Sequence, residues 1–298
     1  MRRWLAGPFG LILVGAVGGW LLTAPQPIDP AQQARAPGDA LRGARIFHVG
    51  GCASCHAAKG AKGADRLKLG GGAALATAFG NFQPPNISPS PDGIAGWSLA
   101  SFDNAMRAGI SPDGRHYYPA FPYASYARMT PSDVADLFAY LGTLPAVAGE
   151  PPAGDIKFPF NIRRGIGLWK RLYLDDDPVI ALPADAPAPV RAGQYLVEGP
   201  GHCGECHTPR TAAGGLDRAR WLQGAPDAEG RGRVPGITPA RLKWSAAEIA
   251  EYLKTGFTPD YDSVGGSMVE VQANMAELPQ ADRAAIAAYL KAVPPKKP

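Results

Sequence analysis

A five-residue pattern, Cys-x-x-Cys-His, occurs twice in this chain of 298 residues. The first copy runs from Cys52 to His56 and the second from Cys203 to His207. The two copies contain all 4 cysteines of the protein and lie about half the chain apart. Any fold of this chain must therefore present the same small cluster of thiols and imidazole twice.

Two thiols separated by two residues can reach the two vinyl groups of one haem, and the His that follows can point a ring nitrogen at the iron. The sequence thus predicts two covalently bound haem c groups. The predicted attachment residues are Cys52, Cys55, Cys203 and Cys206, and the predicted proximal iron ligands are His56 and His207.

Three other uses of paired cysteines are weaker interpretations. A zinc ribbon usually has its two pairs close together in sequence. A thioredoxin-like pair needs a βαβ context, and none is visible. Structural disulfides suit an exported protein but leave both histidines unexplained.

The surroundings of the motifs repeat as well, at a nearly constant offset. Each motif is followed by a Pro-bracketed turn and then by a Trp-Ser pair, at Trp97-Ser98 and Trp244-Ser245. The two Ser are predicted N-caps of helices that end near Gly109 and Gly256. The body of the chain is therefore a tandem duplication.

Each copy closes with another predicted helix, over about 131–144 and 279–293. Thr130 and Asp133 have the spacing of a capping box, and Met129 fits a hydrophobic staple against Val134. No period-two strand pattern appears, so the fold is expected to be mostly α.

The N-terminus predicts a membrane anchor. Arg2 and Arg3 precede an uncharged apolar stretch from Trp4 to about Ala24, long enough for a transmembrane helix. The alternative is a cleaved signal peptide, cut after Ala24 or later, although a Pro follows each candidate cut. Either way the bulk of the chain is expected on the periplasmic side of the inner (cytoplasmic) membrane.

The connector between the copies, 147–186, mixes aromatic and basic residues. One interpretation is an ordered strap that packs across both copies, because aromatic residues in a linker are usually buried. The other is a docking surface for the bilayer or a protein partner. In that case, serine at Arg163, Arg164, Lys170 and Arg171 should slow electron transfer more at low salt.

A haem iron with one His needs a second axial ligand for fast electron transfer, and Met is the usual choice. In the second copy Met268 follows a Gly-rich loop and is the predicted ligand. The alternative, a Met that only fills a core gap, is common for isolated methionines.

These features together resemble the cytochrome c subunits of bacterial membrane alcohol and gluconate dehydrogenases, over roughly 38–294. The resemblance implies tandem class I cytochrome c-like domains after the transmembrane helix. The boundaries that follow are 1–37 for anchor and tether, 38–146 for domain 1, 147–186 for the connector and 187–298 for domain 2. In that family the loop Tyr-Pro-Ala-Met-Pro-Tyr supplies an axial Met, but here Phe121 stands in its place.

The sixth ligand of the first haem is therefore open. The alternatives are Met106 or Met129, His116, or an iron that is five-coordinate or carries a water as its sixth ligand. His48 and His202 lie too close to the attachment motifs to be good candidates.

The leading functional hypothesis is electron transfer from a periplasmic dehydrogenase to a respiratory acceptor such as an oxidase or a quinone-linked complex. The second is a haem enzyme or small-ligand sensor that uses an open site on the first haem. A plain structural module anchored to the membrane is the third. The net charge is only +4 and there is no dense basic patch, so nucleic acid is not an expected partner.

Overall fold

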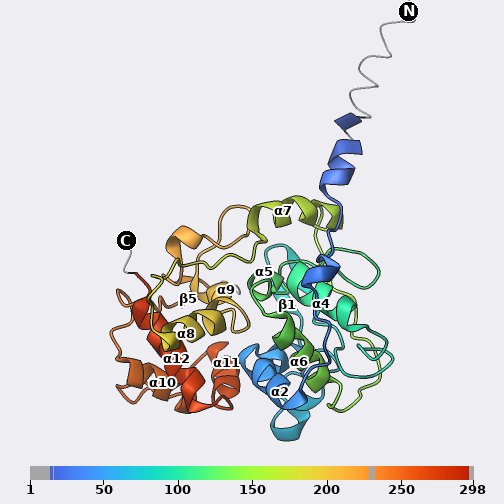
Figure 1. The fold of residues 1–298 in the computed structure, drawn as a ribbon. Coiled ribbons are helices and arrows are strands. Elements are labelled where there is room, and N and C mark those ends of the chain that lie inside the picture. The colour runs from blue at the N-terminus through green and yellow to red at the C-terminus, as the bar shows by residue number, and fades with distance from the viewer. Residues whose placement is uncertain (1–13, 16, 228–231, 295–298) are drawn as a thin grey trace, which may run out of the picture.

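The computed structural model describes residues 14–15, 17–227 and 232–294. Two groups of helices lie side by side, one formed by residues 38–146 and the other by residues 187–294 (Figure 1). We call them repeat 1 and repeat 2. Helix α7 of the connector, residues 147–186, lies at the top of this view, mainly above the group formed by residues 38–146. The domain boundaries expected from the sequence stay predictions.

Repeat 1 is built from short helices joined by long loops. Its α-helices are α2 (Ala40–Val49), α3 (Cys52–His56), α4 (Leu99–Ala108), α5 (Tyr123–Tyr126) and α6 (Pro131–Leu141), with a 3₁₀ turn at Gly63–Leu67. Strands β1 (Leu75–Thr77) and β2 (Gly80–Phe82) pair antiparallel, and β3 (Asp155–Ile156) of the connector adds a third strand beside β2. These strands of two or three residues are too short to show a periodic pattern in sequence.

Repeat 2 follows the same plan after α7 (Ile166–Tyr173). Its α-helices are α8 (Ala188–Glu198), α9 (Gly204–His207), α10 (Ala246–Thr255), α11 (Met268–Met275) and α12 (Gln280–Ala292), with a 3₁₀ turn at Arg218–Arg220. Strands β4 (Ala225–Pro226) and β5 (Arg233–Val234) form a short antiparallel pair. Further 3₁₀ turns lie at Pro30–Gln32 and Arg163–Gly165. The expected predominance of helix agrees with the structure.

Each repeat is held together by the same close crossing of its first and last helices. A Cβ on Gly43 of α2 would lie 1.9 Å from the Asp136 carbonyl oxygen of α6. A Cβ on Gly193 of α8 would lie 1.9 Å from the Ala285 carbonyl oxygen of α12. Only glycine lets the backbones approach this closely, so the same constraint shapes both repeats.

The predicted helix ends of α4 and α10 are confirmed. Ser98 accepts a hydrogen bond from the amide of Ser101, and Ser245 forms a full capping box with Glu248. Gly109 and Gly256 end these helices in the left-handed conformation, with φ of 61° and 78°. These local signals require no tertiary contact, which is why the sequence reveals them.

The capping box predicted at the start of α6 is only half present. Thr130 does accept from the amide of Asp133. The reciprocal bond is missing, because the amide of Thr130 donates to the hydroxyl of Tyr195 at 3.2 Å and Asp133 accepts from that same hydroxyl. A residue of repeat 2 thus completes the cap of a helix in repeat 1.

The predicted transmembrane helix is not supported by the structure. Its helical residues within the described chain are 14–15 and 17–22, and the helix ends at a turn where Thr23 is buried. No helix in the described part of the chain is long and apolar enough to span a membrane. Residues 4–13 and 16 of the expected anchor lie outside the described residues.

Candidate haem sites

The first motif forms the short helix α3 directly after α2. Gly51, which precedes Cys52, has a left-handed backbone with φ of 59° that turns the chain from one helix into the next. The Nδ1 of His56 donates a hydrogen bond to the carbonyl of Pro85 at 2.8 Å. The Pro-bracketed turn recognised in the sequence thus orients the predicted proximal ligand.

The second motif forms α9 and has the same arrangement. The Nδ1 of His207 donates to the carbonyl of Pro235 at 2.7 Å. The motif also contacts Trp221, since a Cβ on Gly204 would lie 2.1 Å from that indole ring. The residue before the first Cys is again left-handed, but here it is His202, with φ of 38°.

Both proximal histidines are prepared to bind a metal through Nε2. Burial lowers the pKa of His56 and of His207, so both rings are neutral at pH 7. The carbonyl partners fix the hydrogen on Nδ1 and leave the Nε2 lone pair for a metal, as in other protein metal sites. The donor set therefore fits haem iron in both repeats.

The cysteines also fit haem attachment better than the alternatives. All four are free thiols in the described residues, which removes the disulfide interpretation. Within the same residues, no group of three or more His, Cys, Asp or Glu side chains gathers around a possible metal position, so a zinc site has no ligand set.

The two positions expected to face the irons differ between the repeats. Met268 is the first residue of α11 and packs, partly buried, against the hydrophobic core. Phe121 precedes α5 and also packs against the core, with its ring centroid 5.6 Å from that of Tyr126 and 5.9 Å from that of Tyr117. The ring of Phe121 is thus partly buried and in contact with other aromatic rings.

Met106 and Met129 lie in the core of repeat 1, at 7% and 3% exposure. Together with Cys52 and Tyr126 they line a small hollow, so both stand near the attachment residue. Neither forms a contact that would mark it as a ligand in preference to the other, and both remain candidates.

His116 is already engaged elsewhere. Its Nε2 lies 2.9 Å from the carbonyl of Thr23, while its Nδ1 is buried with no hydrogen-bond partner among the described residues. Burial, together with the nearby cations Lys170, Arg164 and Arg163, lowers the pKa of His116. This side chain links repeat 1 to the N-terminal segment, which makes it a weaker candidate for the iron.

The sequence did not reveal how the two motifs meet. Ser54, between the cysteines of motif 1, accepts a hydrogen bond from the Asn274 amide of α11 at 2.8 Å. Glu205, between the cysteines of motif 2, accepts from the Ser125 hydroxyl of α5 at 2.8 Å. Each motif therefore docks on the helix that follows the ligand loop of the other repeat.

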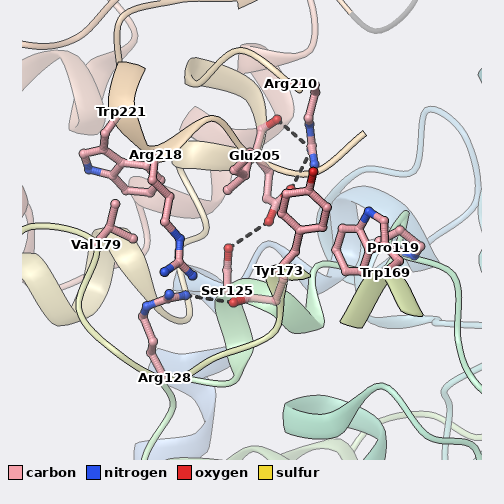
Figure 2. A pocket seen from close by; sticks show the side chains of 12 residues that line it. Pro119, Ser125, Arg128, Trp169, Tyr173, Val179, Glu205, Arg210, Arg218 and Trp221 are labelled. Carbon is pink, nitrogen blue, oxygen red and sulfur yellow. Dashed lines mark hydrogen bonds and ion pairs between the residues drawn. The ribbon is translucent and has the colours of Figure 1, made fainter. Parts of the chain in front are cut away.

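Three arginines, Arg128, Arg210 and Arg218, line the same pocket as Glu205 (Figure 2). Arg210 pairs with Glu205 at 2.6 Å, and Arg218 pairs with Asp175 of the connector at 2.8 Å. Arg128 pairs with that same carboxylate at 3.2 Å. Both repeats and the connector thus meet around the second motif, an arrangement that no local sequence signal announces.

Comparison with known proteins agrees with this geometry. The family "Cytochrome c" matches residues 40–145. A protein described as "Diheme cytochrome c-type" from Cereibacter sphaeroides is 54% identical over 99% of this chain and 99% of its own length. The chain belongs to the dihaem c-type cytochromes. As a member of this family it binds c-type haem covalently.

More distant relatives are subunits of larger enzymes. The "Fructose dehydrogenase cytochrome subunit" of Gluconobacter japonicus is 35% identical over 91% of the chain, and the "Alcohol dehydrogenase (quinone), cytochrome c subunit" of Gluconacetobacter polyoxogenes is 35% identical over 86%. The chain spans only 56% of the length of each. The resemblance expected from the Cys-x-x-Cys-His repeats is confirmed.

The connector of this cytochrome is an ordered strap. Lys170 is 8% exposed and donates to the carbonyls of Ala108 and Gly109, at the C-terminal end of α4, while burial lowers its pKa to about 7. On the other side, Trp169 donates to the carbonyl of Ala213 in repeat 2 at 3.1 Å. The strap interpretation therefore fits the structure.

The three arginines of the predicted docking surface are also used within the molecule. Arg163 donates to the carbonyl of His116, and Arg164 stacks over Trp20 with its guanidinium carbon 3.9 Å from the ring centroid. Arg171 donates to the carbonyl of Leu22. Changing these cations to Ser would thus loosen the strap as well as remove charge, so that experiment alone does not isolate a docking surface.

Proposed function

We propose that this protein is an electron relay with two haems, one in each repeat. The haems would be held by Cys52 and Cys55 in repeat 1 and by Cys203 and Cys206 in repeat 2, with His56 and His207 as proximal ligands. The observation that carries the proposal is the matched pair of histidines, each hydrogen-bonded through Nδ1 to the carbonyl of a Pro-bracketed turn. A bound haem supplies a one-electron Fe(III)/Fe(II) couple.

The protein's own contribution is to orient the two proximal imidazoles and to hold each motif against a buried helix crossing. The prolyl carbonyls fix each imidazole, and the buried α2–α6 and α8–α12 crossings keep each motif on a rigid base. Met268 as the sixth ligand would raise the potential of the second haem. Electrons would then move from the first haem to the second.

The partner we propose is a dehydrogenase outside the cytoplasm, with a respiratory acceptor receiving the electrons. The relatives described as cytochrome subunits of fructose and alcohol dehydrogenases support this class of donor. A periplasmic location suits the covalent haem chemistry expected from the motifs. In this proposal the dehydrogenase binds and oxidises the substrate, and this chain receives only the electrons.

The second candidate is a haem enzyme or a small-ligand sensor, and it rests on Phe121 in place of the axial Met. Two observations disfavour it. The ring of Phe121 packs against Tyr117, Tyr123 and Tyr126, and burial raises the pKa of Tyr117 to about 12, so that this phenol is a poor proton donor. His116 is occupied by the carbonyl of Thr23.

One set of measurements on the purified full-length holoprotein tests the proposal. The relay requires two haems per chain and two separable potentials in a redox titration. It also requires that the reduced protein does not bind carbon monoxide at either haem. One haem per chain, or a single wave from identical centres, contradicts the relay. A high-spin haem that binds carbon monoxide favours the second candidate.

The matched variant for the first haem is Phe121→Met. It restores the family's loop sequence and should raise the potential of that haem while leaving the second potential unchanged. An unchanged first potential would mean that another side chain already occupies the axial position.

A further inference from the structure

The residue before the second motif has a strained backbone conformation, whereas the equivalent residue before the first motif is a glycine and is not strained. The residue before the first cysteine is left-handed in both repeats, and repeat 1 uses Gly51 there, whereas repeat 2 has His202 with φ of 38°. A β-carbon makes this conformation unfavourable, by about 1 kcal/mol or more for a non-glycine residue. Strained positions of this kind persist where the side chain has a role, so the contacts of His202 are informative.

The imidazole of His202 reaches across the interface to repeat 1. Its Nε2 lies 3.2 Å from the carbonyl oxygen of Gly50, and because a carbonyl only accepts, Nε2 is the donor. Its ring also packs edge-on against Tyr126, with centroids 5.5 Å apart. The hydroxyl of Tyr126 donates to the same Gly50 carbonyl at 3.4 Å.

Both ends of this contact lead directly to a haem attachment residue. Gly50 is two residues before Cys52, and a Cβ built on Gly50 would lie 3.7 Å from the Cys52 sulfur. His202 is bonded directly to Cys203. A continuous path therefore links the two predicted attachment cysteines. It runs from Cys203 through the covalent bonds of His202 to its ring, across the one hydrogen bond to Gly50, and along the backbone to Cys52.

The wider interface holds this hydrogen bond in place. Arg45 of α2 pairs with Asp282 of α12 at 2.6 Å, and Tyr195 of α8 donates to Asp133 of α6. These two contacts are reciprocal, since the first helix of each repeat binds the last helix of the other. The interface thus has the approximate twofold character of a symmetric dimer within one chain.

We propose that His202 is the positioning residue of the inter-haem contact and that an electron passes between the two haems through the His202–Gly50 hydrogen bond. This inference rests on the proposed two-haem relay. Bound haems would supply both the electron donor and the electron acceptor, so that one electron lost by one haem would be gained by the other. His202 and Gly50 would provide the hydrogen-bonded link between them, with no proton transfer and no additional reactant.

The variant that tests the inference is His202→Gly, because glycine accepts the left-handed backbone and is the residue that repeat 1 has at this position. Partial photoreduction of the dilute holoprotein gives the intramolecular rate constant, followed at the absorption bands of the two haems. We expect a loss on the order of tenfold, since small losses of positioning produce large losses of rate. A redox titration of the same sample checks that the two potentials, and hence the driving force, are unchanged.

The matched control is Arg45→Gln. It weakens the same interface but lies away from the path between the motifs. Hydrogen–deuterium exchange over residues 196–203 reports the docking of the interface in both variants without any electron transfer. Slow transfer in His202→Gly with nearly wild-type transfer in Arg45→Gln supports the bridge.

Two results overturn it. Wild-type rates in His202→Gly would mean that electrons bypass the histidine, and equal slowing in both variants would mean that the residue acts only through docking. If glycine lowers haem incorporation, His202→Asn replaces it, because Asn tolerates the left-handed backbone and lacks the imidazole ring that spans to Gly50 and Tyr126. Two haems per chain in the wild type with unchanged variant rates would refute the bridge and leave the relay intact.

Discussion

Glu198 is the buried acid that ties the connector to repeat 2, and its removal should be costly. Its side chain is 2% exposed and accepts hydrogen bonds from the amides of Val179 at 2.7 Å and Ile180 at 3.2 Å. It also accepts from the hydroxyl of Tyr289, whose oxygen in turn accepts from the indole of Trp221. Trp221 packs on the second motif, so this network runs from the connector to a haem site.

In Glu198→Ala the donors that lose this acceptor include two in buried surroundings, the Ile180 amide and the Tyr289 hydroxyl. A buried donor left without a partner costs about 1–3 kcal/mol, which gives roughly 2–6 kcal/mol for the pair. The lower end applies if water enters the space left by the carboxylate. The connector at Val179 and Ile180 should loosen together with the repeat.

The assay is equilibrium urea unfolding of the holoprotein, followed by far-ultraviolet circular dichroism. Glu150→Ala is the matched control, because Glu150 is an exposed acid of the connector, and it should change the unfolding free energy by less than about 0.5 kcal/mol. A loss below about 1 kcal/mol for Glu198→Ala would refute the idea that this network is a main support of the second repeat.

Three further predictions concern stability. Because burial lowers the pKa of His116 below its ordinary 6.5, the unfolded chain binds more protons than the folded chain below that pH, and stability falls as the pH decreases. Melting temperatures measured from pH 7 to 5 should therefore drop more steeply in the wild type than in His116→Gln, and parallel curves would contradict this. Gly193→Ala should lose about 1–3 kcal/mol in urea unfolding, since its Cβ meets the Ala285 carbonyl, and a neutral result would show that the helices can separate freely. Arg45→Ala should lose about 1–3 kcal/mol in the same assay by leaving Asp282 unpaired, and full stability would mean that this ion pair is screened by solvent.

The features that the sequence could predict are local ones. Ser245 and Glu248 form their capping box within four residues, and Gly256 ends the same helix, so no distant contact was needed to place α10. The Pro-bracketed turn was also visible as a repeated pattern behind both motifs, although only the structure shows that its Pro85 carbonyl orients His56. Duplication made these signals stronger, as each was present twice.

The features that escaped the sequence are set by contacts between the repeats. Thr130 and Asp133 have capping-box spacing, yet Tyr195 takes the reciprocal bonds, and only the docked repeat shows this. The N-terminal prediction was wrong for a related reason. Hydropathy counts apolar residues along the chain, whereas no helix of the described residues is long and apolar enough to span a membrane, and Thr23 beside the N-terminal helix packs against Gly167 of the connector.

The differences between the two repeats carry the functional information that their similarity hides. A duplicated chain begins with equal constraints at equivalent positions, so a site where one copy departs from the other needs a separate cause. Phe121 departs from Met268 at the loop that is predicted to face the iron, and His202 departs from Gly51 at the motif itself. The first departure would give the two proposed haems different axial ligands and hence different potentials. The second introduces strain before the first cysteine of motif 2 and directs a donor at repeat 1. In the proposed relay, the first departure would set the difference in potential and the second would link the two attachment sites.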